Sequence, residues 1–143
     1  MTDMSKDEIT RFLSQGTLTA KVSTVSKDGT SHIVPVWFAL DGEDIIFTTG
    51  HESVKAKNII RDNRVSICVD DQKPLYSFVT VYGNASIIQE NNSNELLKWA
   101  TMIAQRYMGR ENAEKYGKRN AVKGELLIRV KPTKIIAQKD IAE

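Results

Sequence analysis

Two Asp-Gly pairs, at residues 28–29 and 41–42, impose tight turns on the N-terminal third of the chain. This dipeptide supplies the backbone freedom that a hairpin turn requires. The segments on either side of the turns, 17–25, 31–40 and 44–49, are rich in β-branched and aromatic residues, which favours strands. Strands joined by such short turns pair with their neighbours, so this region is predicted to form an antiparallel meander of three strands.

Three further β-rich segments follow, at 64–69, 76–89 and 125–138. In the second of them, Gly83 indicates a bulge or a close backbone approach, and residues 131–133 are predicted to kink the last. Helical periodicity is found at 6–15, 54–62, 94–108 and 111–118. Six strand segments with short turns and a few helices predict one mainly β (α+β) domain over residues 1–143, a small six-stranded antiparallel barrel with peripheral helices.

The composition argues against several classes of function. The chain is 41% hydrophobic and 27% charged, as soluble globular proteins are. It has no run of about 18 apolar residues for a membrane span and no signal-peptide region. A net charge of +2 with scattered basic residues argues against nucleic-acid binding. The single cysteine, Cys68, excludes an intrachain disulfide, and the few histidines lack metal-site spacing. We therefore expect a cytoplasmic protein without a bound metal.

The sequence offers no recognisable catalytic group. It has neither a Gly-x-Ser-x-Gly nucleophile motif nor a glycine-rich dinucleotide fingerprint. His32 lies in a predicted strand, where a structural role is the common one. His51 lies in a turn, where it either contacts a ligand or is solvated. No catalytic side chain is therefore assigned.

The turn from the third strand into the second helix carries the most distinctive polar pattern. Thr48 and Thr49 precede a predicted N-cap, Ser53. Lys55 and Lys57 follow in the first helical turn, where the helix dipole disfavours cations by several tenths of a kcal/mol. A bound phosphate would reverse this, because hydroxyl, ammonium and backbone N–H groups would converge on it. The alternative is an ordinary capped surface helix with solvated lysines. Residues two apart diverge by about 200° on a helix, so Lys57 is the weaker of the two candidates.

Three segments, Val34-Pro35-Val36-Trp37-Phe38, Phe47-Thr48-Thr49 and 53–58, resemble in their order the pyridoxamine 5′-phosphate oxidase-like proteins with a split β-barrel. The chain looks most like their deazaflavin (F420)-dependent branch, over roughly residues 8–138. The resemblance implies a homodimer with identical cofactor sites at the subunit interface. It places the cofactor phosphate against Thr48, Thr49, Ser53, Lys55 and Lys57. It places the ring system along Pro35, Val36 and Trp37, with Tyr76 or its neighbours arriving from the partner chain.

The resemblance implies an oxidoreductase that transfers a hydride between reduced coenzyme F420 and a small unsaturated organic acceptor. One alternative is an FMN-binding oxidoreductase of the same fold, and another is a non-catalytic flavin- or haem-binding carrier or sensor. Oxidation of pyridoxamine phosphate is not expected. His32 and Trp37 occupy the positions of basic residues that bind the flavin phosphate in the oxidase, and its tryptophan- and arginine-rich C-terminal segment is missing after Lys131.

Overall fold

A computed structural model describes residues 1–88 and 93–143. Within them the strands are β1 (Thr2–Asp3), β2 (Ala20–Val25), β3 (Ser31–Val36), β4 (Ala39–Asp41), β5 (Asp44–Gly50), β6 (Arg64–Asp71), β7 (Ser77–Ile88) and β8 (Glu125–Lys139). The helices are α1 (Lys6–Ser14), α2 (Val54–Arg61), α3 (Ser93–Met108) and α4 (Ala113–Asn120), with a short 3₁₀ helix, η1 (Arg110–Asn112). The predicted strand 76–89 is thus β7, and its last residue, Gln89, lies outside the described residues.

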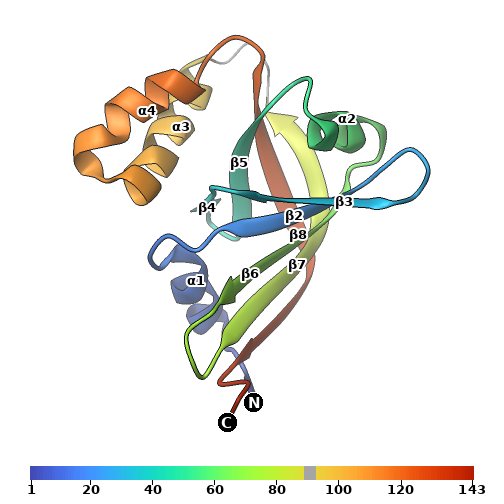
Figure 1. Cartoon of the computed structure of the whole chain (residues 1–143), viewed down its shortest axis with the longest axis vertical. Coiled ribbons are helices and arrows are strands. Elements are labelled where there is room, and N and C mark those ends of the chain that lie inside the picture. Colours follow the sequence, from blue (N-terminus) through green and yellow to red (C-terminus); the bar gives the residue numbers. More distant parts are fainter. Residues whose placement is uncertain (89–92) are drawn as a thin grey trace.

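All strands of the described chain belong to one antiparallel sheet in the order β3–β2–β6–β7–β8–β5–β4, with β1 added beside β8. The sheet is strongly curved, so that β2 and β3 cross in front of β8 in Figure 1. Its hydrogen-bonded path is open between β3 and β4, yet only Trp37 and Phe38 separate these two strands in the chain. One continuous segment therefore pairs first with β2 and then with β5. This is the predicted split barrel with peripheral helices, in its eight-stranded form.

The strand count differs from the predicted six for two reasons. The predicted strand 31–40 breaks into β3 and β4, because Phe38 takes its hydrogen bonds outside the sheet: its N–H donates to Tyr107 and its carbonyl accepts from Arg106. The dipeptide β1 forms because it docks on the far end of β8. Neither the break between β3 and β4 nor the formation of β1 is indicated by a local pattern in the sequence.

The core fills the inner face of the curved sheet. Its fully buried members come from alternating strand positions and include Val22, Phe38, Ile45, Phe47, Ile67, Val69, Val79, Val81, Ile128 and Val130. The helix α1 packs on one end through Phe12 and Leu13 and begins with a capping box formed by Ser5 and Glu8. A second cluster, Ile46, Trp99 and Leu127, joins α3 to the outer face of β5 and β8. The α3–α4 hairpin thus lies on one side of the barrel and α2 on the other (Figure 1).

The strand β8 runs through the predicted kink at residues 131–133 without a break. Tyr82 pairs with Lys134 while Gly83 pairs with Pro132, so Thr133 is the extra residue of a bulge. A Cβ atom on Gly83 would lie 2.5 Å from the carbonyl oxygen of Lys131. Both features predicted for Gly83, a bulge and a close backbone approach, are therefore confirmed. None of the helices in the described part of the chain is both long and apolar enough to span a membrane.

Candidate functional site

The turn between β5 and α2 is built around the hydroxyl of Ser53. As predicted, Ser53 caps α2, and its Oγ accepts a hydrogen bond of 3.1 Å from the N–H of Ala56. The same oxygen lies 2.8 Å from Oγ1 of Thr49, a side chain only 3% exposed. The first N–H groups of a helix lack intrahelical partners, and in the described chain those of Val54 and Lys55 have no acceptor. This turn can therefore bind an anion through backbone groups.

The two threonines of the turn point to opposite faces of β5, because successive strand residues alternate. Thr49 is buried and bound to Ser53, so its hydroxyl supports the helix cap. Thr48 shares the other face with Gly50, and its side chain hydrogen-bonds the carboxylate of Glu125. The residues predicted to contact the phosphate thus fall into two groups: Thr49 and Ser53, which cap the helix, and those on the outer face of β5, such as Thr48.

Glu125 is a member of this outer group that the sequence did not reveal. It is the first residue of β8 and pairs with Gly50, and its Oε1 lies 3.7 Å from where a Cβ of Gly50 would be. Burial raises the pKa of Glu125, while the hydrogen bond from Thr48 and the nearby charge of Lys55 act in the opposite direction. Because only the β5–β8 register brings Glu125 to the turn, no local signal could have found it.

The two lysines of α2 differ as their angular separation predicts. Lys55 is half-buried beside Glu125, and burial lowers its pKa, with the charge of Glu125 opposing that shift. Lys57 is exposed to solvent. An ammonium that is already partly dehydrated and close to free backbone N–H groups is suited to an anion, so Lys55 is the better-placed cation.

The rest of α2 is fixed to the sheet. Asn58 is buried and donates from Nδ2 to Oγ1 of Thr24 on β2 over 2.9 Å. Arg61 donates to the carbonyl of Val25 and, over 3.0 Å, to Oδ1 of Asn58. His51, at the start of the turn, is tied to the opposite loop: its N–H donates to the carbonyl of Gly124 over 2.8 Å, and its ring Nδ1 lies 2.9 Å from the same oxygen. The C-terminal half of α2 is therefore fixed to β2, and the turn before the helix is fixed to Gly124.

The predicted ring shelf lies on β3, an edge strand of the sheet, where Pro35 is tolerated although it has no N–H to donate. Pro35 lies opposite Lys21 and Val36 opposite Ala20, so these two neighbours face opposite sides of the sheet. Trp37 follows the strand and stacks on Tyr107 of α3, with ring centroids 5.1 Å apart and planes 4° from parallel. The Tyr107 hydroxyl donates to the carbonyl of Leu18 over 2.8 Å, which fixes the ring under Trp37.

Tyr76 lies apart from the other predicted residues. It is 45% exposed in the loop between β6 and β7, and its carbonyl accepts a hydrogen bond from Ile141 near the C-terminus. This loop is at the end of the molecule opposite α2 (Figure 1). Within one chain Tyr76 does not meet the β5–α2 turn, and its arrival from a partner chain stays a prediction.

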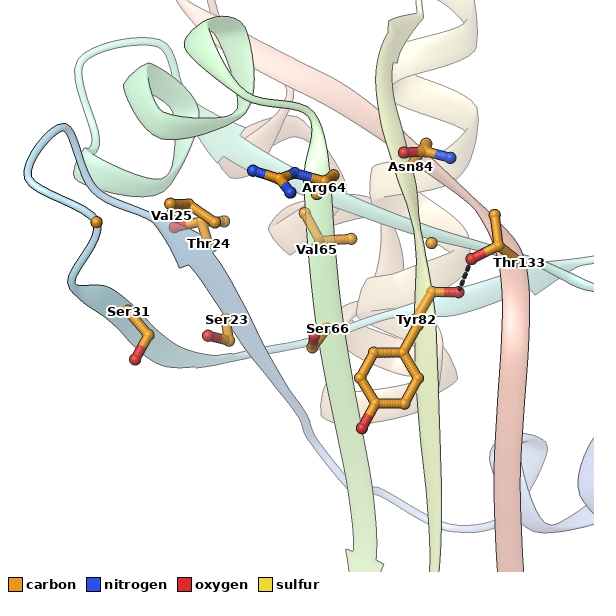
Figure 2. A pocket seen from close by; sticks show the side chains of 12 residues that line it. Ser23, Thr24, Val25, Ser31, Arg64, Val65, Ser66, Tyr82, Asn84 and Thr133 are labelled. Carbon is orange, nitrogen blue, oxygen red and sulfur yellow. Dashed lines mark hydrogen bonds between the residues drawn. The ribbon is translucent and has the colours of Figure 1, made fainter.

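A hollow of about 530 Å³ lies on the outer face of β2, β6 and β7. Figure 2 shows that Ser23, Ser66 and Tyr82 line it side by side, with Arg64 and Asn84 further along. The guanidinium of Arg64 is bound to Asp62 over 2.7 Å. None of the predicted cofactor residues lines this hollow, and its hydroxyl-rich wall has no group set up for acid–base chemistry.

A family model described as pyridoxamine 5′-phosphate oxidase matches residues 5–139. Comparison with curated proteins finds no match. Among solved structures, the conserved hypothetical protein Rv2991 from Mycobacterium tuberculosis is 25% identical, with a TM-score of 0.82 over 96% of this chain and 86% of that one. A protein described as an F420 reductase is 26% identical, with a TM-score of 0.66 over 87% of this chain and 94% of that one. The haem storage protein HutZ from Vibrio cholerae is 18% identical, with a TM-score of 0.72 over 96% and 98%, and shows likeness of fold alone.

Proposed function

The chain belongs to the pyridoxamine 5′-phosphate oxidase family, and from this premise we propose that it is an oxidoreductase that uses reduced coenzyme F420 to deliver a hydride to a small unsaturated organic acceptor. The observation that carries the proposal is the β5–α2 turn, where a capped helix N-terminus, the Thr48 hydroxyl and the half-buried Lys55 lie together. The similarity to an F420 reductase favours the deazaflavin over other flavins.

In this proposal the cofactor phosphate binds at the N-terminus of α2. The N–H groups of Val54 and Lys55 and the Lys55 ammonium donate to it, together with the Thr48 hydroxyl. Ser53 and Thr49 keep the first turn in place through their own hydrogen bonds. Lys57, being exposed, contributes only its charge.

The ring system is assigned to the shelf of Pro35, Val36 and Trp37. When bound, the deazaflavin supplies the hydride, and the protein binds, orients and shields it from water. The stack on Tyr107 holds the Trp37 ring at one angle, so the shelf is preformed. No side chain is assigned to the chemical step.

We assign the site to the interface of a homodimer. The β6–β7 loop, which carries Tyr76, lies at the opposite end of the molecule from α2 (Figure 1), so in this proposal a second copy brings Tyr76 to the site. The outer face of β2, β3, β6 and β7 carries exposed apolar side chains, with Ile33 62% and Tyr82 40% exposed. A second copy that covered this face would bury them.

Replacing Lys55 tests the phosphate assignment. Lys55→Ala should weaken F420 binding by about 1–3 kcal/mol, the size of a charge-assisted hydrogen bond. Lys57→Ala is the matched control, because it removes the same charge two residues away on the exposed side. The dissociation constants come from fluorescence titration of apo-protein with F420. Equal effects of the two changes would place the phosphate elsewhere.

The same titration separates the proposed function from its alternatives. FMN and haemin are titrated beside F420, and binding of F420 should be the tightest. Preferred binding of FMN would support a flavin oxidoreductase. Tight binding of any of them without turnover of enone or quinone acceptors would support a carrier or sensor.

A further inference from the structure

We infer that Glu125 selects the charge of the phosphate at the β5–α2 turn, so that the site admits a singly charged phosphodiester and disfavours a doubly charged phosphomonoester. The inference rests on the proposed function and deepens it, since it names the class of phosphate that the site takes. Coenzyme F420 is a phosphodiester, and FMN is a phosphomonoester.

The position of Glu125 is fixed by the sheet. Its backbone pairs with Gly50, the last residue of β5, immediately before the turn. A Cβ at Gly50 would lie 3.7 Å from Oε1 of Glu125, so the carboxylate lies against this residue. Thr48, two residues earlier on the same face, hydrogen-bonds it. The carboxylate therefore lies on the side of the turn that carries Lys55.

The donors proposed for the phosphate are the ones that surround Glu125. Thr48 already uses its side chain on this carboxylate, and the charges of Lys55 and Glu125 act on one another. An anion that binds here must share these donors with a carboxylate that stays within a few ångströms. The site therefore differs from an anion-binding site whose charged side chains are all cations.

The charges at the turn come close to balance for one added negative charge. Lys55 supplies one positive charge, the helix N-terminus about half of one, and Glu125 one negative charge. The other ionisable groups at the turn, His51, Glu52 and Lys57, have exposed side chains, that of Glu52 being 83% exposed. Water screens them far more than the half-buried pair.

A second charge on the phosphate would face Glu125 directly. At a separation of a few ångströms near a protein surface, repulsion between two unit charges is worth on the order of tenfold or more in a binding constant. Phosphomonoesters carry most of this second charge at neutral pH and above, because their second pKa is about 6. A phosphodiester never carries it. Glu125 therefore separates the two classes without touching the ring.

The test compares two ligands that share one ring. The 5′-phosphomonoester of the deazaflavin and its methyl phosphodiester are titrated into apo-protein at pH 8, with wild type, Glu125→Gln and Glu52→Gln. Wild type should bind the diester about tenfold more tightly or better. Glu125→Gln, which keeps an amide oxygen for Thr48, should close this gap by strengthening the binding of the monoester. Glu52→Gln removes an exposed charge of the same sign and should leave the ratio unchanged.

Each result decides the matter. A monoester that binds wild type as tightly as the diester overturns the inference, as does a ratio that Glu125→Gln leaves unchanged or that Glu52→Gln changes equally. In these cases both ligands still bind and the proposed function stands. Failure of both ligands to bind wild type overturns the proposed function together with the inference.

Discussion

Arg106 on α3 holds together three parts of the chain that no strand pairing joins. Its guanidinium donates to the carbonyls of Leu13 at 2.8 Å, Gln15 at 3.1 Å, Gly16 at 3.0 Å and Phe38 at 3.0 Å. The first two are at the C-terminus of α1, where carbonyls lack helical partners. The last is at the break between β3 and β4. Arg106 therefore caps α1 and fixes the strand break at once.

Replacing Arg106 with alanine should destabilise the protein by about 3–5 kcal/mol. Hydrogen bonds from a charged donor contribute about 1.5–3 kcal/mol each, but those to the exposed Gln15 and Gly16 carbonyls are largely replaced by water. The bonds to Leu13 and Phe38 are partly buried and dominate the loss. The guanidinium also lies 4.5 Å from the Phe38 ring centroid, which adds a fraction of a kcal/mol to about 2. For a chain of this size the loss corresponds to a fall in Tm of roughly 10–20 °C.

Urea and thermal unfolding followed by circular dichroism measure this loss. Arg106→Lys keeps the charge but not the planar fork, so it should fall between wild type and Arg106→Ala. Arg110→Ala, which removes an exposed arginine, should change stability by no more than about 0.5 kcal/mol. A loss below about 1 kcal/mol for Arg106→Ala would refute the reasoning, since the four carbonyls would then be satisfied without the guanidinium.

Two further predictions concern the sheet and the first helix. Gly83→Ala should lower the free energy of unfolding in urea by about 1–3 kcal/mol, because its Cβ would lie 2.5 Å from a backbone oxygen. Gly50→Ala is the control and should lower it much less, because the nearest atom to its Cβ would be 3.7 Å away. Equal losses for the two variants would contradict this account. The hydrogen bond from Lys139 holds the pKa of Glu8 at about 2, so ionised Glu8 stabilises the fold above its usual pKa near 4.5 and this contribution is lost as the pH falls towards 2. Glu8→Gln should therefore flatten the fall of Tm between pH 5 and pH 2, and parallel curves for wild type and variant would contradict the assignment.

The elements whose ends are set by neighbouring residues could be predicted from the sequence. The capping box of Ser5 and Glu8 fixes the start of α1, the hydroxyl of Ser53 fixes the start of α2, and the Asp-Gly pairs fix the turns. Each of these signals acts over three or four residues. The division of 31–40 into β3 and β4 could not be predicted, because the groups that take Phe38 out of the ladder come from α3, about 70 residues away.

The candidate site was only partly predictable for the same reason. The difference between Lys55 and Lys57 follows from helix geometry and could be predicted. The opposite orientations of Thr48 and Thr49 follow from strand alternation, which extends through the end of β5. Glu125 could not be found, because its place beside the turn depends on the register between strands that begin 81 positions apart, at Asp44 and Glu125.

The two ends of the proposed cofactor site are held by helices rather than by strand pairing. At the ring end, Trp37 follows the last paired residue of β3 and is fixed by Tyr107 of α3. At the phosphate end, Ser53 and Thr49 hold the first turn of α2, and the buried bond between Asn58 and Thr24 fixes its second turn. Neither end can shift without breaking hydrogen bonds to a neighbouring element, so the geometry exists before a ligand binds. A preformed site loses little conformational freedom on binding, which raises affinity without further contacts. Tyr107 therefore supports the proposed ring shelf and also accepts the hydrogen bond from the Phe38 N–H at the break between β3 and β4.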